Sequence, residues 1–135
     1  MLNKMSQQLD FLQHSLDLRA KRAEVIAGNI ANADTPGYKA VDFDFAKALQ
    51  AQTSQQNGSL GMALTDSRHL TGRGSQAAGG ELQYRSAVQR SIDGNSVDMD
   101  IERAAYTDNA LKYQSTLTFL GRRISGLMDA IKGGQ

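Results

Sequence analysis

Apolar residues recur every seven positions in both terminal segments of this 135-residue chain, and this spacing constrains the fold most. In residues 1–33 two apolar columns alternate at intervals of three and four residues, with Arg19 as the single break. The same spacing runs through residues 98–132, where Arg103 is the break. It is typical of helices that pair along a narrow seam. The predicted intrachain seam consists of Leu9, Leu12, Leu16, Ile26, Ile30, Tyr106, Tyr113, Leu117, Leu120, Ile124 and Leu127.

A second apolar stripe lies elsewhere on the N-terminal helix and consists of Phe11, Leu18 and Val25, again seven residues apart. At about 100° per residue, it lies well around the helix from the seam. It could be buried inside the chain's own domain, or it could contact a neighbouring subunit. The chain has no Trp and only four Phe and four Tyr, so little else could cover both stripes. We therefore expect this stripe to be an intersubunit contact.

Local signals bound the two helices. Pro36, the only proline, and Gly37 suit the second and third positions of a type II turn that stops the first helix. Asp98 is the expected N-cap of the last helix. Charged residues and a glycine suit the two ends of that helix, namely Asp100, Glu102, Lys132 and Gly133. Each helix would be about 50 Å long, and the matching lengths favour an antiparallel pair.

The sequence predicts a mainly α fold in four segments: a coiled-coil helix over residues 1–33, a motif turn and short segment over 34–50, a Gly/Gln/Ser-rich and partly flexible middle over 51–97, and a second coiled-coil helix over 98–132. The long helices would pair as an antiparallel coiled coil joined by an extended, loop-rich middle. Residues 43–49 could start a short helix, whereas 51–58 and 72–80 are expected to be mobile. Residues 60–64 and 82–85 are candidates for short extended pieces.

Composition argues against several classes of function. The net charge is only +1, which argues against nucleic-acid binding through bulk charge. Without Cys, the chain has no disulfides, thiolate metal sites or cysteine nucleophiles. No apolar run approaches the roughly 20 residues that cross a bilayer, so we expect no direct membrane insertion. The first ten residues also lack the apolar run of a secretory signal, so export would need another route.

Catalytic and ligand-binding patterns are weak. His14 is expected on the outer, solvated face of the first helix, and His69 follows Asp66 and Ser67 too closely in sequence to indicate a triad by itself. The glycines of residues 72–77 do not follow a predicted strand, as a dinucleotide fingerprint requires. The acidic residues of 93–100 lack the spacing of a calcium-binding loop. The sequence therefore predicts no catalytic, cofactor-binding or metal-binding residues and no cofactor.

Two motifs resemble bacterial flagellar rod and hook proteins. The first is Asn-Ile-Ala-Asn-Ala-Asp-Thr-Pro-Gly-Tyr-Lys over residues 29–39, in which a helix end meets a Thr-x-Gly-aromatic-Lys turn. Its extension over residues 40–45, together with Asp-Gly-Asn-Ser-Val-Asp-Met-Asp-Ile-Glu over 93–102, is similar to the proximal-rod members of that family. With both terminal helices, the resemblance covers about two-thirds of the chain. The residues that carry the motif turn are Asn29, Asn32, Thr35, Pro36, Gly37 and Tyr38.

The resemblance implies a structural subunit of the flagellar basal body rod, in the periplasmic space, with no enzymatic role. It implies export through the flagellar type III apparatus and helical polymerisation. The implied partners are other copies, other proximal rod proteins, the MS-ring region with its rod-base adaptor, and the export gate. Phe45 and Leu49 fit a short export-gate element, although they also fit the first turn of a local helix.

Three other classes remain open from the sequence. The chain could be a coiled-coil adaptor or secretion chaperone that stays in the cytoplasm. It could be a small hydrolase built around Ser67 and His69, or a helix that lies on a membrane surface. Mixed charges on the polar helix faces disfavour the last of these.

Overall fold

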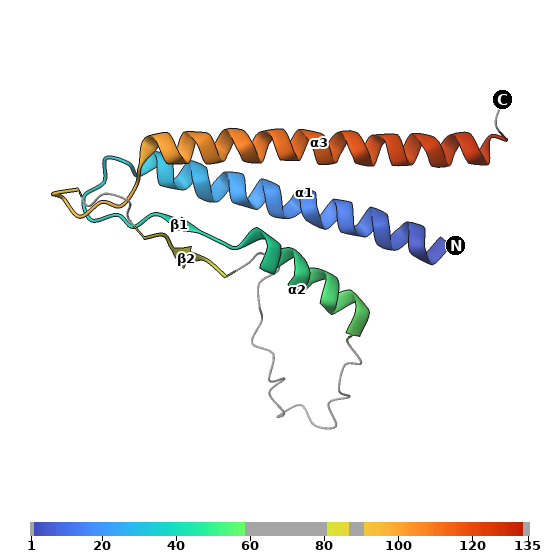
Figure 1. The fold of residues 1–135 in the computed structure, drawn as a ribbon, viewed down its shortest axis with the longest axis horizontal. Helices are drawn as coiled ribbons and strands as arrows, with labels where there is room; N and C mark the ends of the chain where they lie inside the picture. The colour runs from blue at the N-terminus through green and yellow to red at the C-terminus, as the bar shows by residue number, and fades with distance from the viewer. Residues whose placement is uncertain (1, 59–80, 87–90, 134–135) are drawn as a thin grey trace, which may run out of the picture.

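A computed structural model describes residues 2–58, 81–86 and 91–133 of the chain. Three helices and two short strands make up this part: α1 (Leu2–Ala31), β1 (Val41–Asp42), α2 (Phe45–Gly58), β2 (Gln83–Tyr84) and α3 (Met99–Ile131). The fold is mainly helical, with a two-stranded sheet, as the sequence predicts (Figure 1).

The long helices α1 and α3 run in opposite directions. They lie close together near the turns and diverge toward the end of the molecule that carries both the N- and the C-terminus (Figure 1). The element α1 lies between α3 on one side and α2 with the two strands on the other. We call residues 40–58 and 81–86 the arm, since they form β1, α2 and β2 beside the helix pair. The prediction of two long terminal helices in an antiparallel pair is confirmed, and α1 is covered on two sides.

Local chemistry explains where α3 begins and ends. The Asp98 carboxylate accepts hydrogen bonds from the amides of Asp100 at 3.0 Å and Ile101 at 3.2 Å, so Asp98 is the N-cap, as predicted. At the other end the Lys132 amide donates to the Met128 carbonyl, and Gly133 takes a φ of 82°. A positive φ just after a helix favours glycine, because a side chain would be strained there.

The arm corrects one prediction about the middle of the chain. Residues 51–58 were expected to be mobile because they are rich in Gln, Ser and Thr, but α2 continues through Gly58. Glutamine and alanine are good helix formers, which outweighs the polar composition. The extended piece expected over 82–85 is confirmed, because β2 pairs antiparallel with β1 and the Arg85 amide donates to the Ala40 carbonyl. Residues 60–64 and 72–80 lie outside the described part.

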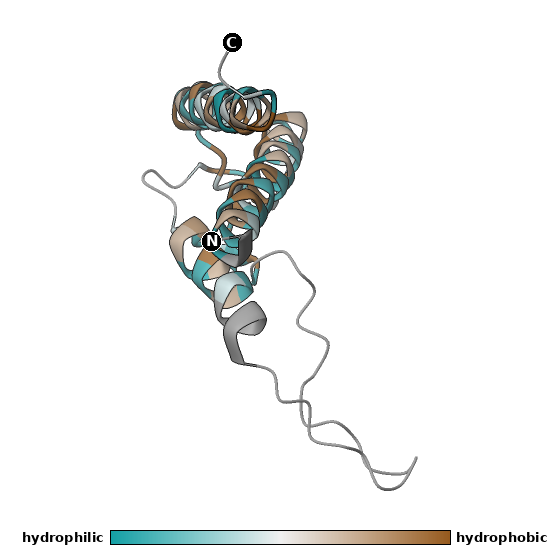
Figure 2. Ribbon diagram, turned by 90° about the vertical axis from the view of Figure 1, so that its right-hand side faces the viewer, coloured by the Kyte–Doolittle hydropathy of each residue, from teal (hydrophilic) through white to brown (hydrophobic). Residues whose placement is uncertain are grey.

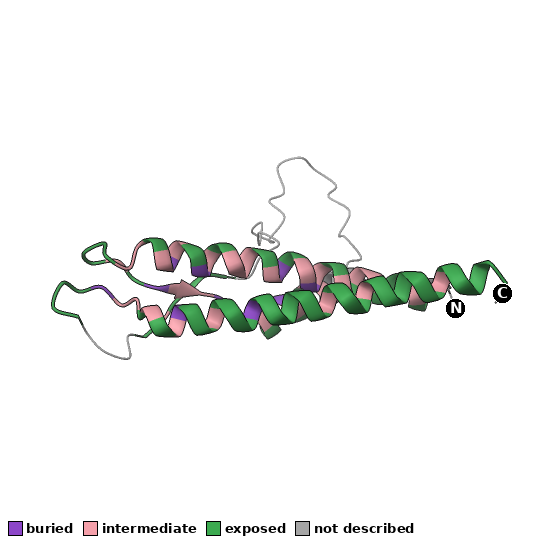
Figure 3. Ribbon diagram, turned by 90° about the horizontal axis from the view of Figure 1, so that it is seen from above, coloured by how far each residue is buried: buried purple, intermediate pink, exposed green. Residues whose placement is uncertain are grey.

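The apolar core is small and sits between α1 and the arm. Leu18, Phe43 and Ala48 are buried together, and Val25, Phe45 and Leu49 pack against them. Ile26 and Ala40 are the remaining buried apolar residues among those described. Burial is concentrated toward the end of the molecule where the turns lie, whereas the C-terminal half of α3 is mainly exposed (Figure 3). Among the described helices, none has a stretch apolar and long enough to cross a membrane.

Candidate functional site

The family motif turn forms directly after α1. The Tyr38 amide donates to the Thr35 carbonyl at 3.2 Å, and Gly37 has a φ of 74°. Proline at the second position and a left-handed glycine at the third describe the expected type II turn. The residues at its apex are exposed, namely Asp34, Thr35, Pro36 and Gly37. The turn therefore presents an exposed surface at one end of the molecule (Figure 1).

Asn29 ties this turn to the arm and to α3. It is completely buried, and its amide nitrogen donates to the Val41 carbonyl at 2.8 Å and to Glu102 Oε2 at 3.2 Å. Its side-chain oxygen accepts from the Val41 amide at 3.1 Å and from the Tyr38 hydroxyl at 3.4 Å. Both ends of the amide are therefore satisfied, as a buried polar group requires. This explains why the motif needs an asparagine at this position.

Asn95 joins the second motif to the end of α1. Its side-chain nitrogen lies within 3.0 Å of the carbonyls of Asn32, Ala33 and Thr35, and its side-chain oxygen accepts from the Val97 amide at 2.8 Å. The carbonyls of Asn32 and Thr35 also accept from the amides of Thr35 and Tyr38. Asn95 therefore adds a second donor to these two carbonyls and supplies one to the Ala33 carbonyl, just beyond the end of α1. The motif over residues 93–102 thus caps the motif over residues 29–39.

Backbone contacts hold the two motifs together as well. The Gly37 amide donates to the Asp93 carbonyl at 3.0 Å, and the Ser96 amide donates to the Tyr38 carbonyl at 3.0 Å. Gly94 has a φ of 77° at the bend between these contacts. The sequence indicated each motif separately, but it gave no signal that the two turns dock on each other.

Four charged side chains form a network that we call the charge cluster: Arg22 on α1, Asp42 on β1, Arg85 after β2 and Glu102 on α3. Arg22 binds both oxygens of Asp42, at 3.2 and 2.9 Å. Arg85 binds Asp42 at 2.7 Å and Glu102 at 2.8 Å. Glu102 is only 1% exposed. Two positive and two negative groups thus balance within the cluster, and they join α1, α3 and both strands.

The charge cluster perturbs the titration of its members. Burial raises the pKa of Asp42, but hydrogen bonds from Arg22, the Phe43 amide and Arg85 outweigh it and hold that pKa below its ordinary value. The hydrogen bond with Asp42 also raises the pKa of Arg22. Asp42 is therefore ionised at neutral pH, which keeps the cluster intact there.

The second apolar stripe is not free for a neighbouring subunit along its whole length, so that prediction is wrong at two of its three residues. Leu18 is 1% exposed and Val25 packs beside it, because Phe43 and α2 cover this side of α1. Phe11 remains on the surface, 43% exposed. The small number of aromatic residues suggested that nothing within the chain could cover this stripe, but Phe43 and α2 do so.

The face of α3 toward α1 also differs from the predicted seam. The residues buried there are Glu102 and Asn109, seven positions apart, and the Asn109 amide donates to the Arg19 carbonyl at 2.8 Å. Leu120 and Leu127 are half-buried, but Leu117 and Ile124 are 43% and 45% exposed. Hydrophobic spacing could not reveal that a polar column faces inward. On α1 the predicted seam is half-buried or buried, namely Leu9, Leu12, Leu16, Ile26 and Ile30.

Because Glu102 and Asn109 face α1 in place of the predicted seam, several apolar residues of α3 lie on its surface. We call it the outer stripe, and it consists of Tyr106, Tyr113, Leu117, Ile124, Met128 and Ile131. Their spacing places them on one side of the helix. Hydrophobic residues recur along both long helices in the view along the molecule (Figure 2). Exposed apolar stripes of this length mark surfaces that bind other proteins.

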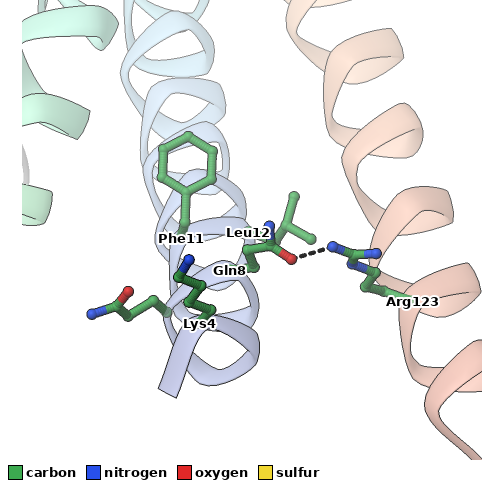
Figure 4. A pocket seen from close by; sticks show the side chains of 6 residues that line it. Lys4, Gln8, Phe11, Leu12 and Arg123 are labelled. Carbon is green, nitrogen blue, oxygen red and sulfur yellow. Dashed lines mark hydrogen bonds between the residues drawn. The ribbon is translucent and has the colours of Figure 1, made fainter. Parts of the chain in front are cut away.

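A groove of about 520 Å³ opens where the N-terminal part of α1 and the C-terminal part of α3 diverge. The Arg123 guanidinium donates to the Gln8 side-chain oxygen across it (Figure 4). Phe11 contributes to the apolar part of its wall. The lining residues are Lys4, Gln7, Gln8, Phe11, Leu12 and Arg123.

The structure offers no grouping of residues typical of a catalyst within the described part. His14 is half-buried and its Nδ1 is buried without a hydrogen-bond partner, so the expectation of a solvated His14 is wrong. Ser67, His69 and the glycines of residues 72–77 lie outside the described part. Among residues 2–58, 81–86 and 91–133, no group of three His, Asp or Glu side chains is arranged to hold a metal ion.

Comparisons with known proteins agree with the motifs. A family model described as "Flagella basal body rod protein" matches residues 9–39. The chain is 44% identical to the flagellar basal body rod protein FlgB of Salmonella typhimurium, with 99% of each chain covered. It is 46% identical to FlgB of Yersinia ruckeri over 99% of this chain and 100% of the relative. Identity to FlgB of Aeromonas hydrophila is 45%, with 91% of each chain covered. This chain belongs to the FlgB family of flagellar basal body rod proteins, and it is accordingly a structural protein of the rod and not an enzyme.

Proposed function

We propose that this protein is a structural subunit of the proximal rod, that it is exported by the flagellar type III apparatus, and that it polymerises helically through its terminal helices. In this role it is needed for rod assembly and motility. Its partners are other copies, other proximal rod proteins, the MS-ring region with its rod-base adaptor, and the export gate. The assembled subunit lies in the periplasmic part of the basal body.

The outer stripe of α3 is the observation that carries this proposal. Leu117 and Ile124 stand 43% and 45% exposed on a helix of 33 residues, and nothing in the described part of the chain covers them. Burying such side chains against a neighbour stabilises an assembly by about 25 cal/mol per Å² of apolar area removed from water. The single subunit lacks this stabilisation, so its α3 becomes fully packed only in the rod.

Two further surfaces support contacts between subunits. Phe11 and the groove around it lie at the diverging ends of α1 and α3, and the exposed motif turn lies at the opposite end (Figure 1). Surfaces at opposite ends of one molecule suit a head-to-tail contact, which generates an open helical assembly when it does not close into a ring. The intersubunit role expected of Leu18 and Val25 is not part of this proposal, because the arm covers them.

The folded structure bears on the candidate export element. Phe45 is half-buried under the guanidinium of Arg19, which lies 4.3 Å from the ring centroid, and Leu49 packs against the core. An export gate that reads these two side chains would reach them before the arm docks. The element is thus compatible with export of an unfolded chain, followed by folding at the site of assembly.

A pair of adjacent substitutions tests the proposal. Ile124→Asp places a charge on the outer stripe, whereas Ser125→Asp places the same charge on the neighbouring exposed position outside the stripe. Ile124→Asp should be secreted through the flagellar apparatus but not incorporated into rods, so the cells are non-motile. Ser125→Asp should be incorporated and support motility. Secretion is measured by immunoblotting of culture supernatants, and incorporation by immunoblotting of purified basal bodies.

The same experiment separates the proposal from a cytoplasmic adaptor. An adaptor would remain in the cell in both variants and would be missing from purified basal bodies. Normal incorporation of Ile124→Asp would show that the outer stripe is not an assembly contact.

A further inference from the structure

We propose that the charge cluster is a clasp that positions the arm against the two long helices, with Arg85 as its key positioning residue. In this view the cluster fixes the strand register and the place of α2. Loss of Arg85 releases the arm as a unit while α1 and α3 stay helical. The inference concerns the folded subunit and does not depend on the proposed role in export or assembly.

Apart from the charge cluster, the arm is held by a short strand pair, a small apolar contact, and hydrogen bonds that join Asn29 and Ser96 to the backbone of Val41 and Ala40. The two strands share only two residue pairs, and an isolated pair of such short strands is not stable in water. The apolar contact between the arm and α1 centres on three buried residues, namely Leu18, Phe43 and Ala48. Arg85 adds the ionic link from the returning strand to α3, through Glu102 at 2.8 Å.

Because Glu102 is buried, its ion pair with Arg85 favours the correctly docked arm. Glu102 is 1% exposed, and a buried carboxylate without a counter-charge is strongly destabilising. Asn29 donates a hydrogen bond to Glu102, and Arg22 acts on it electrostatically from farther away, but in the described part of the chain only Arg85 forms an ion pair with it. An arm that docks without Arg85 in place would therefore leave Glu102 buried and unpaired, so correct docking and neutralisation of Glu102 occur together.

The geometry also rejects a shifted register. Arg85 reaches Asp42 on the adjacent strand with one guanidinium nitrogen and Glu102 on α3 with the other. Successive side chains of a strand point to opposite faces, so a slip of one residue would turn Arg85 away from both carboxylates. The planar fork of arginine suits this double contact, whereas a lysine could serve only one partner at a time.

Hydrogen exchange of the full-length protein tests the clasp. Arg85→Met keeps much of the side-chain stem but removes the charge. The matched control, Lys112→Met, removes a cation from the exposed ion pair with Asp108, whose side chains are 55% and 53% exposed. In Arg85→Met the amides of Val41, Ala48 and residue 85 should exchange at least tenfold faster than in the wild type. Amides of residues 115–120 in α3 should change less than threefold, and the control should change less than threefold throughout.

Several outcomes would overturn the proposal. The clasp is refuted if Arg85→Met exchanges like the wild type, or if α3 loses protection to the same extent as the arm. It is equally refuted if the arm amides of the wild-type protein are already unprotected. A variant that fails to fold counts against it as well, because the proposal requires α1 and α3 to remain helical.

A second variant tests whether the charges act as a unit. Glu102→Gln removes one charge but keeps hydrogen-bonding groups at that position. Alone it should accelerate exchange of the Val41 amide, whereas in the Arg85→Met background it should add less than threefold. Independent effects would instead multiply. Multiplication would show that Arg85 and Glu102 do not act through each other, and the clasp would be rejected.

Discussion

Replacement of Leu18 by alanine should destabilise the isolated subunit far more than the same change at Leu117. Leu18 is 1% exposed and contacts Phe43 and Ala48, whereas Leu117 is 43% exposed on the outer stripe. Removal of a buried leucine side chain costs about 2–5 kcal/mol, according to how far the site can collapse. Here the surrounding core is small, so α2 can shift toward α1 and close part of the cavity, and we expect the lower half of that range, about 2–3 kcal/mol.

Urea denaturation of both variants, followed by circular dichroism, measures this difference. A small domain loses about 1–3 kcal/mol of stability per molar urea, so Leu18→Ala should lower the unfolding midpoint by about 0.7–3 M. Leu117→Ala leaves no internal cavity and also gains helix propensity, so its midpoint should move by less than about 0.5 M. Equal shifts in the two variants would refute the claim that the arm covers the second stripe of α1. That stripe would then be available to a neighbouring subunit, as the sequence alone suggested.

Three further predictions concern the turns and the charge cluster. Gly37→Ala should destabilise the fold by about 1–2 kcal/mol, because φ is 74° at this position. Gly121→Ala should instead stabilise α3 by up to about 1 kcal/mol, because alanine favours helix and a Cβ there meets no other atom within 4 Å. The midpoints of thermal unfolding of the two variants should therefore move in opposite directions. Asn95→Ala removes the side-chain donor that the carbonyls of Asn32, Ala33 and Thr35 share and should cost about 1–3 kcal/mol, with faster hydrogen exchange of the Tyr38 amide. Unchanged exchange would contradict the docking of the two motifs. The pKa of Asp42 is lowered in the folded state, so the ionised carboxylate contributes its full stabilisation of the fold above the unfolded pKa of about 4, and this contribution is lost as the pH falls through the lower folded pKa. The difference in unfolding free energy between wild type and Asp42→Asn should therefore shrink below about pH 4. A difference that stays constant with pH would be contrary evidence.

Local chemistry made part of the fold predictable. The spacing of three and four residues indicated both long helices, and Asp98, Pro36 and Gly37 indicated where they begin and end. Each of these signals acts within one turn of backbone, so neighbouring residues are enough to reveal it. The helix over residues 51–58 is harder to predict, because a Gln-, Ser- and Thr-rich composition also suits a mobile segment, although glutamine itself favours helix.

The inward face of α3 could not be predicted from hydrophobicity. Glu102 and Asn109 are buried because distant residues supply their partners: Arg85 and Asn29 for Glu102, and the Arg19 carbonyl for Asn109. The spacing of apolar residues indicates which side of a helix avoids water. It does not indicate hydrogen bonds between residues far apart in the sequence, such as Asn29–Glu102 and Asn109–Arg19, which are 73 and 90 positions apart. The same limit applies to the docking of the two motifs, since Asn95 finds its acceptors about 60 residues away. Sequence reasoning found each motif, and only the structure shows that they form one site.

Electron microscopy of basal bodies tests the rod assignment most directly. Basal bodies would be purified from a strain that lacks this gene, and from the same strain carrying the wild-type gene, the Ile124→Asp variant or the Ser125→Asp control. Our account predicts rings without a rod in the deletion strain and with Ile124→Asp, and complete rods with the wild-type gene and with Ser125→Asp. Complete rods in the deletion strain would contradict the role of the protein in building the rod.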